Sequence, residues 1–233
     1  VDIRGGAPGT VGNYEENDAI CFAGGSLYGL EAAAGVSAEL FAQRNYSSDF
    51  MKIAAVSGAI IYDFGSRKNS IYPDKALGRA ALRAAQPGSF PLGARGAACS
   101  ATVGNGYNFQ MGEQSGQGGA FRQVGPTKIA VFTVVNAIGA IVNRQGEVVL
   151  GHLNHKKGTR SHAIDDLERR LVNGHATNPS PGNTTPTLVV TNQKLSQWEL
   201  TQFGRQVHAS MARAIQPFHT PFDGDVLYAV TTN

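Results

Sequence analysis

The sequence predicts a single α/β domain with tightly packed sheet and helix. Nearly unbroken apolar runs, typical of strands covered on both faces, alternate along the chain with segments that carry helical apolar stripes. Charged residues make up only 16% of the chain, against a usual figure of about 25%, and there are 29 glycines, which leaves little solvated helix surface. A length of 233 residues fits one large domain, and we expect residues 1–233 to form it.

Two helices and a buried strand are predicted in the first half of the chain. Residues 26–44 follow a pair of glycines, begin with a serine suited to an N-cap and carry a partly helical apolar stripe. The run IAAVSGAIIYDF over residues 53–64 is nearly all apolar, as in a strand covered on both faces. Pro73 then opens a second helix that extends to about Ala85.

The middle of the chain combines a β-rich segment with a polar one. Residues 128–142 are rich in β-branched side chains and are interrupted by Asn136 and Gly139, which predicts two strand pieces or one bulged strand. Residues 152–183 carry charge, proline and glycine with few large apolar side chains, so we expect an exposed loop with room for one short helix. This loop is the best candidate for a processing segment.

The last third of the chain carries the clearest local signals. A strand pattern resumes at residues 187–191, and Ser196 and Glu199 have the spacing of a capping box at the start of the longest helix. That helix carries one apolar stripe, formed by Leu195, Trp198, Phe203, Val207 and Met211. The turn Asp223-Gly224-Asp225 then leads into the strand VLYAVTT.

Composition argues against several classes of partner. The formal charge of +3 is spread along the chain, so we expect no nucleic-acid partner. A charged-then-apolar leader and an apolar run of about 18 residues are both missing from the sequence, so we expect a cytoplasmic protein with no membrane contact. Cys21 and Cys99 lie among small apolar residues and are predicted to be buried free thiols.

The most specific motif is Pro181-Gly182-Asn183-Thr184-Thr185, where the polar loop meets a buried strand. A threonine hydroxyl is a weak nucleophile, but an adjacent free α-amino group, with a pKa of about 7.7–8.0, can accept its proton. If the hydroxyl of Thr184 attacks the Asn183 carbonyl and the resulting ester is hydrolysed, one residue becomes both nucleophile and base. Taken alone, the motif is more often a plain turn into a strand.

Other polar residues have both a structural and a catalytic interpretation. Asp223 and Asp225 could orient a threonine or tune its amine, or could simply form an Asp-Gly turn. Asn136 and Tyr62 lie in apolar strands, where each needs a hydrogen-bond partner, and Asn136 could serve as an oxyanion donor. His208 and His219 could bind a metal but lack ligand spacing, and the glycine-rich stretches lack a phosphate-loop ending, so neither metal nor cofactor is predicted.

Six runs of the sequence together resemble the self-processing aminopeptidase/amidase family of DmpA type, over nearly the whole chain and in the same order. This family includes L-aminopeptidase/D-amidases, β-peptidyl aminopeptidases and 6-aminohexanoate-oligomer (nylon-oligomer) hydrolases. The chain looks closest to the last group because it has a threonine at the processing site and the Asp-Gly-Asp pair. The runs are AICFAGGSLYGLEAAAGV, IIYDF, YPDKALGRAAL, GNTT, QVHASMARAIQPFHT and DGDVLYAVTT.

The resemblance implies a four-layer αββα sandwich like that of the N-terminal-nucleophile hydrolases. It also implies cleavage into residues 1–183 and 184–233, oligomers of processed units, and hydrolysis of linear amides such as 6-aminohexanoate oligomers. By the same resemblance Thr184 is the nucleophile and Asn183-Thr184 the processing bond. The remaining catalytic roles would fall to an oxyanion-side amide, two carboxylates and a pocket-lining hydroxyl, namely Asn136, Asp223, Asp225 and Tyr62.

The chain departs from the family at one position. The nylon-oligomer hydrolases carry an active-site lysine after a small-residue strand, whereas the matching stretch here, Val103-Gly104-Asn105-Gly106, has none. Asn105 could donate a hydrogen bond but no charge, so we place it with Tyr62 among the predicted substrate-binding residues; Lys75 is a more distant candidate for the cation. The alternatives are an aminopeptidase of the same family, an acyltransferase resembling ornithine acetyltransferase, and a non-enzymatic or metal-binding relative.

Overall fold

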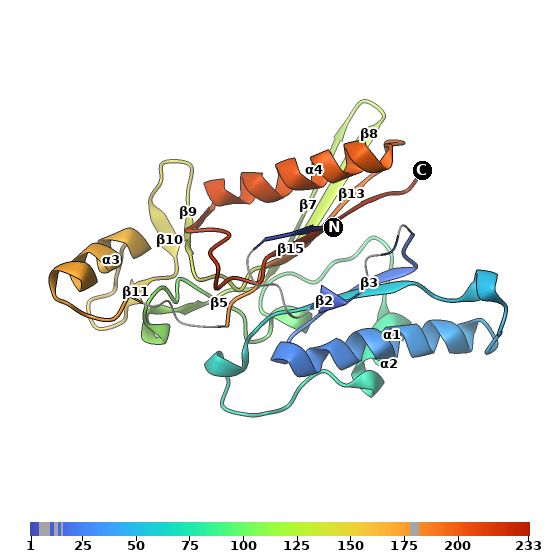
Figure 1. Cartoon of the computed structure of the whole chain (residues 1–233), viewed down its shortest axis with the longest axis horizontal. Coiled ribbons are helices and arrows are strands. Elements are labelled where there is room, and N and C mark those ends of the chain that lie inside the picture. Colours follow the sequence, from blue (N-terminus) through green and yellow to red (C-terminus); the bar gives the residue numbers. More distant parts are fainter. Residues whose placement is uncertain (5–9, 12–13, 15, 178–181) are drawn as a thin grey trace.

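The computed structural model describes residues 1–4, 10–11, 14, 16–177 and 182–233. Its elements stack in four layers, helix, sheet, sheet and helix, which confirms the predicted αββα sandwich (Figure 1). One outer layer is α4 (Gln197–Ser210), and the other is the pair α1 (Leu30–Gln43) and α2 (Lys75–Ala84). Pro181 of the predicted processing motif falls outside the described residues.

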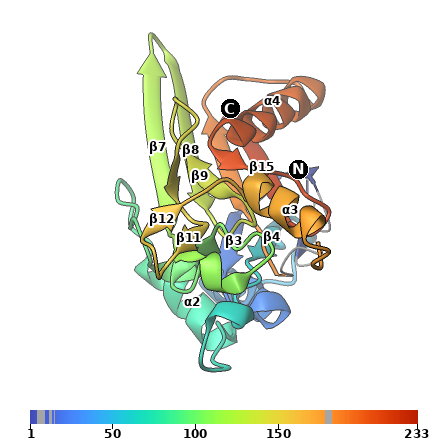
Figure 2. The ribbon, with the colours of Figure 1, turned by 90° about the vertical axis from the view of Figure 1, so that its left-hand side faces the viewer.

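The larger sheet has five strands in the order β1-β15-β13-β8-β7. β13 lies at its centre, parallel to β15 and antiparallel to β8. Figure 2 shows β7 and β8 as a long hairpin at one side of this sheet. The strand bounds are β1 Asp2–Ile3, β7 Gln117–Val124, β8 Thr127–Val134, β13 Pro186–Thr191 and β15 Val226–Thr231.

The smaller inner sheet has the order β2-β4-β3, with bounds β2 Thr10–Val11, β3 Ala19–Ala23 and β4 Val56–Ile60. Its β4 is buried along its whole length, as the apolar run predicted. Ala59 of β4 packs against Val226 and Tyr228 of β15, which joins the two sheets. The Tyr228 hydroxyl donates to Gly58 O at 3.2 Å, and burial raises the pKa of this phenol to about 12.

The remaining elements are short. The additional strands are β5 Thr102–Val103, β6 Glu113–Gln114, β9 Ala140–Val142, β10 Val148–Leu150, β11 Leu153–Asn154, β12 Thr159–Arg160 and β14 Ile215–Gln216, with the helix α3 Ala163–Val172. Short 3-10 helices cover Ser26–Gly29, Phe50–Lys52, Phe64–Ser66, Gly96–Ala98, Phe109–Met111 and Met211–Arg213.

Most predicted elements are present. The segment 128–142 forms two strand pieces, β8 and β9, and Asn136 lies between them. Ser196 and Glu199 make the predicted capping box, and the segment 152–183 contains one helix, α3. Two five- to eight-residue strands, β3 and β7, were not predicted; β7 is mostly exposed and carries two glycines, so it lacks the apolar alternation that reveals a strand.

The prediction for the cysteines is partly wrong. Both are free, as expected, but Cys99 is exposed and Cys21 is only partly buried. Cys99 follows the 3-10 helix Gly96–Ala98, which turns its side chain outward while Ala98 takes the buried position.

In the described part of the chain, none of the helices has the length and apolar character needed to cross a bilayer.

Candidate active site

The predicted site residues converge at one end of the central sheet. β13 and β15 are parallel, so the residues that precede them lie at the same end, and β8 is antiparallel, so its last residue reaches that end as well. The converging residues are Tyr62 after β4, Asn105 after β5, Asn136 after β8, Asn183 and Thr184 before β13, and Asp223 and Asp225 before β15.

Thr184 is 3% exposed, and both its backbone N–H and its side-chain hydroxyl donate hydrogen bonds. Its N–H donates to Asn136 O at 2.6 Å, and its hydroxyl donates to the carbonyl oxygen of Asn183 at 2.6 Å. The same carbonyl oxygen accepts the backbone N–H of Gly224 at 2.9 Å. The hydroxyl therefore lies beside the carbonyl group of the predicted processing bond, and a fixed N–H donor points at the oxygen of that group.

The residues before Thr184 are held in an unusual path. Gly182 has φ +93°, a left-handed conformation that side chains rarely adopt, and it packs beside Tyr62. Asn183 is 2% exposed and forms a parallel bridge with Asp223. The Asn105 side-chain amide donates to Asn183 Oδ1 at 2.9 Å, so the position before the predicted cut is anchored through both backbone and side chain.

Asp223 and Asp225 are both buried, at 1% and 0% exposed, and their oxygens accept separate sets of donors. Asp223 Oδ1 accepts Ile138 N–H at 3.2 Å, and its Oδ2 accepts the Thr220 hydroxyl at 2.6 Å. Asp225 Oδ1 accepts the N–H of Thr185 at 3.0 Å. Asp225 is therefore bonded to the residue that follows the candidate nucleophile, and Asp223 is bridged to the residue that precedes it.

The electrostatics of the two carboxylates differ from those of exposed aspartates. Burial raises the pKa of Asp223 to about 6, and the negative charge of Asp225 adds to this rise. Asp223 therefore titrates near neutral pH, where a side chain can act as either a proton donor or a proton acceptor. The two-aspartate turn is thus also a pair of interacting buried acids.

Asn136 and Tyr62 are bonded to each other. Asn136 Nδ2 donates to the carbonyl oxygen of Tyr62 at 3.0 Å, and Asn136 Oδ1 accepts Thr102 N–H at 3.0 Å. Asn136 therefore connects its own segment to those of Tyr62 and Thr102. One hydrogen of its side-chain amide is bonded to Tyr62 O, so the other could bond an oxyanion. Burial raises the pKa of the Tyr62 hydroxyl. The catalytic roles of both residues stay predictions.

Asn105 lies in the stretch where the resemblance led us to look for a lysine. Its side chain is 1% exposed, and its Nδ2 bonds Thr102 and Asn183, which places it inside the site. Lys75 begins α2 on the outer helical layer and is exposed, and none of the ion pairs among the described residues joins it to Asp223 or Asp225. Asn105 is therefore part of the site, whereas Lys75 lies outside it.

Three contributors to the site were not predicted: the Gly224 N–H, the Thr220 hydroxyl and the His219 side chain. His219 Nδ1 lies 3.1 Å from Asp225 Oδ2, whereas the sequence suggested only a metal role for this residue. The short spacing within HTPFDGD was the available signal, since Thr220 and His219 lie three and six residues from the aspartates that they bond. Among the described residues, no cluster of three or more His, Cys, Asp or Glu side chains could hold a metal ion.

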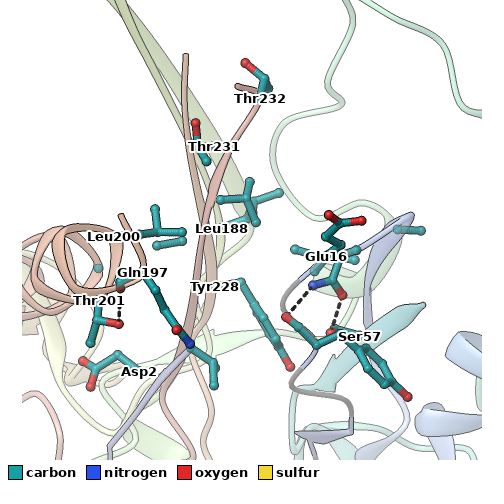
Figure 3. A pocket seen from close by; sticks show the side chains of 18 of the residues that line it. Asp2, Glu16, Ser57, Leu188, Gln197, Leu200, Thr201, Tyr228, Thr231 and Thr232 are labelled. Carbon is teal, nitrogen blue, oxygen red and sulfur yellow. Dashed lines mark hydrogen bonds between the residues drawn. The ribbon is translucent and has the colours of Figure 1, made fainter. Parts of the chain in front are cut away.

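A cavity of about 870 Å³ lies elsewhere in the molecule, between the two sheets and α4 (Figure 3). Asp2, Glu16, Ser57, Leu188 and Tyr228 are among its lining residues. Its lining includes none of the predicted site residues.

Comparison with known proteins agrees with the geometry. The sequence model of peptidase family S58 matches residues 3–233. The chain is 48% identical over 233 residues to a putative NylC-analogous protein from Agromyces sp. (strain KY5R), of which it covers 76%. It is also 48% identical over 233 residues to a 6-aminohexanoate-oligomer endohydrolase from Kocuria sp. (strain KY2). This match covers the whole of the present chain but only 65% of the length of that enzyme.

Among solved structures, the fold is similar to that of the L-aminopeptidase D-Ala-esterase/amidase from Ochrobactrum anthropi, described as a variant of the Ntn hydrolase fold. The TM-score is 0.58 at 16% sequence identity, and the match covers 85% of this chain and 49% of the other. At this identity the likeness supports the fold. It agrees with the four layers seen here.

Proposed function

The chain belongs to peptidase family S58, and from this premise we propose that it is an amide hydrolase that cuts itself between Asn183 and Thr184. The freed Thr184 then acts as an N-terminal nucleophile on linear amides. The observation that carries this proposal is the hydrogen bond from the Thr184 hydroxyl to the Asn183 carbonyl oxygen, which Gly224 N–H also contacts.

Self-cleavage follows from that arrangement by ordinary acyl-transfer chemistry. The Thr184 oxygen attacks the Asn183 carbonyl carbon as its proton leaves, and the carbonyl oxygen takes up negative charge beside Gly224 N–H. The C–N bond then breaks, the Thr184 nitrogen takes a proton, and an ester remains. Water hydrolyses the ester to give the Asn183 carboxylate and a Thr184 with both a free amine and a free hydroxyl.

The same parts can then serve substrate hydrolysis. The new α-amino group, with an expected pKa of about 7.7–8.0, can take the proton of the Thr184 hydroxyl as it attacks a substrate amide. Gly224 N–H stays available to the oxyanion because it belongs to the backbone of the turn between the two aspartates. The side-chain amide of Asn136 is the second candidate donor.

The proposed substrate class is an unbranched amide such as an oligomer of 6-aminohexanoate. Support comes from relatives at 48% identity that are named 6-aminohexanoate-oligomer endohydrolases. This chain spans only 65% of the length of these relatives, so the substrate in their names is a proposal for this chain.

Replacing the nucleophile tests the proposal. Thr184→Ala should give one uncut chain without amide hydrolysis, because the attacking hydroxyl is gone. Thr184→Ser keeps a hydroxyl and should still yield two pieces. Intact mass under denaturing conditions distinguishes one chain from two, and a Thr184→Ala protein that still splits at this bond would refute the assignment.

A substrate panel tests the reaction class. Processed protein should release 6-aminohexanoate from its linear oligomers faster than it cleaves β-peptides or the amides of L- and D-amino acids. A preference for the peptides or amino-acid amides would keep the nucleophile and move the protein to the aminopeptidase branch. Acyl transfer from acetylornithine to an amine without amide hydrolysis would replace the hydrolase with an acyltransferase.

A further inference from the structure

Two histidines connect the carboxylate beside the nucleophile to the N-terminal strand. His219 donates its backbone N–H to Asp225 Oδ2 at 3.2 Å, and its ring Nδ1 lies 3.1 Å from the same oxygen. His208 of α4 is fully buried and its Nδ1 lies 2.9 Å from Asp2 Oδ2 of β1. The two imidazole rings pack edge to face, with centroids 4.3 Å apart and planes at 81°.

The contacts of Asp225 show what the His219 ring does. One carboxylate oxygen accepts the N–H of Thr185, the residue after the nucleophile, and the other accepts only from His219 in the bonds of the described residues. A carboxylate oxygen accepts and an imidazole N–H donates, so this contact is a hydrogen bond in the tautomer that carries its proton on Nδ1. His219 therefore holds one oxygen of the Asp225 carboxylate, and the other oxygen holds the backbone N–H of Thr185.

Filling space alone does not explain this arrangement. His219 has φ +60°, an uncommon conformation for a residue other than glycine, and Nε2 of both histidine rings is buried with no hydrogen-bond partner among the described residues. A buried polar atom without a hydrogen-bond partner destabilises a protein. Such features cluster at functional sites, where surrounding contacts maintain them.

Charge near the site also favours a role for this ring. Asp223 and Asp225 are both buried, and Asn105 brings no charge where the resembled family has a lysine. Among the ion pairs of the described residues, His219 is the sole basic side chain on either aspartate. The titratable groups around it are Asp225 and Asp223 in the turn before β15, His208 on α4 and, beyond His208, Asp2 on β1.

We propose that His219 is a positioning residue that holds the Asp225 side chain fixed on the Thr185 amide, with the His208 ring, tethered to Asp2, keeping the His219 ring in place. The inference rests on the proposed function, since it assigns His219 a task in activating Thr184. It predicts that removing the ring donor loosens the backbone at Thr185, because Asp225 is then held less firmly.

Two variants separate positioning from packing. His219→Asn tolerates the left-handed backbone and retains a side-chain N–H near the position of Nδ1. His219→Gly also tolerates that backbone and retains its own N–H, but it has no side-chain donor. The pair thus differs chiefly in the hydrogen bond to Asp225 Oδ2.

The first measurement is catalysis by processed protein, with active sites titrated so that unfolded molecules are not counted. His219→Gly should lower kcat by about 10-fold to 10²-fold with little change in KM, because the misplaced Asp225 no longer holds the backbone beside Thr184. His219→Asn should recover most of the loss. Wild-type kcat in His219→Gly, or an equal loss of kcat in His219→Asn, would overturn the positioning role.

The second measurement needs no activity. In the uncut Thr184→Ala chain, amide exchange of Thr185 followed by NMR should be about tenfold faster with His219→Gly than with His219→Asn, because Asp225 is no longer held. Equal Thr185 exchange in the two variants would overturn the inference even if the chain is a hydrolase. Faster Thr185 exchange in His219→Gly than in His219→Asn, combined with no amide hydrolysis by the wild-type protein, would support the contact to Asp225 and refute the proposed function.

Discussion

At the scale of single residues, Asp223 couples the site to pH. Its pKa is raised from 3.8 to about 6, first by burial and then by the charge of Asp225. A carboxyl group whose pKa is raised by folding stabilises the folded state while protonated, and this contribution is lost as pH rises from about 3.8 through about 6. The wild-type melting temperature should therefore fall relative to that of Asp223→Asn over this range.

The difference between the two melting curves is the informative quantity, because Asp223→Asn also disturbs the bonds to Ile138 and Thr220 by a constant amount. Thermal melts of uncut Thr184→Ala protein at several pH values between 4 and 7 would measure it. Glu168→Gln, which changes an exposed carboxyl group on α3, serves as the control and should follow wild type throughout. A constant difference for Asp223→Asn would contradict the raised pKa.

Asn105 depends on an adjacent glycine. A Cβ atom at Gly112 would lie 2.1 Å from Asn105 Oδ1, so Gly112→Ala should push the Asn105 amide away from Asn183. The backbone at this position, with φ −68°, accepts alanine without strain. Self-cleavage should slow by about 10-fold to 10²-fold, since small displacements of groups that hold a reacting bond have effects of this size.

A time course of intact mass after refolding measures that rate. Gly118→Ala is the matched control, because a Cβ there meets open space on β7 and should leave the rate unchanged. Equal rates for the two variants would show that Asn105 does not hold the processing bond.

At the scale of elements, the outer helices α1 and α2 approach each other through glycine. A Cβ at Gly78 would lie 2.1 Å from the backbone oxygen of Ala32, and one at Gly35 would lie 2.3 Å from that of Lys75. Gly78→Ala should destabilise the protein by about 1–3 kcal/mol through overpacking, despite the better helix propensity of alanine.

Urea unfolding of uncut Thr184→Ala protein measures this effect. Ala81→Gly, at an exposed position of the same helix, is the comparison and should cost only its propensity difference of about 1 kcal/mol. A more stable Gly78→Ala variant would mean that the two helices can move apart freely.

At the scale of the whole molecule, the predicted cut separates the chain without separating the fold. Residues 184–233 contain α4 and the adjacent strands β13 and β15, and β13 pairs along five positions with β8 of the longer piece. Val226 and Tyr228 also pack against Ala59 of the other sheet. The interface between the pieces is therefore part of the core, whose burial stabilises both.

We accordingly expect the processed pieces to elute together under native conditions and to melt in one transition. Gel filtration followed by denaturing mass spectrometry would show both masses in one peak. The uncut Thr184→Ala chain is the control for elution volume. Separate elution of residues 184–233 would contradict the central position of β13.

Local sequence by itself determined the elements whose signals span a few residues. The capping box at Ser196 and Glu199 marks the start of α4, and the apolar run around Val56–Ile60 marks a buried strand, because helix and strand periods repeat within each segment. Resemblance to a family then identified Thr184, Asp223, Asp225, Asn136 and Tyr62 as a group before any contact among them was visible.

Only the tertiary structure decided how distant segments meet. The Gly224 N–H reaches the Asn183 oxygen because β13 and β15 are parallel neighbours, and His208 meets Asp2, 206 residues away, because α4 covers the strand β1. Likewise, β7 is a strand because it pairs with β8 and not because of its own pattern. Such contacts depend on the packing of whole layers, for which sequence spacing carries no period, so they emerge only when the complete sandwich is assembled.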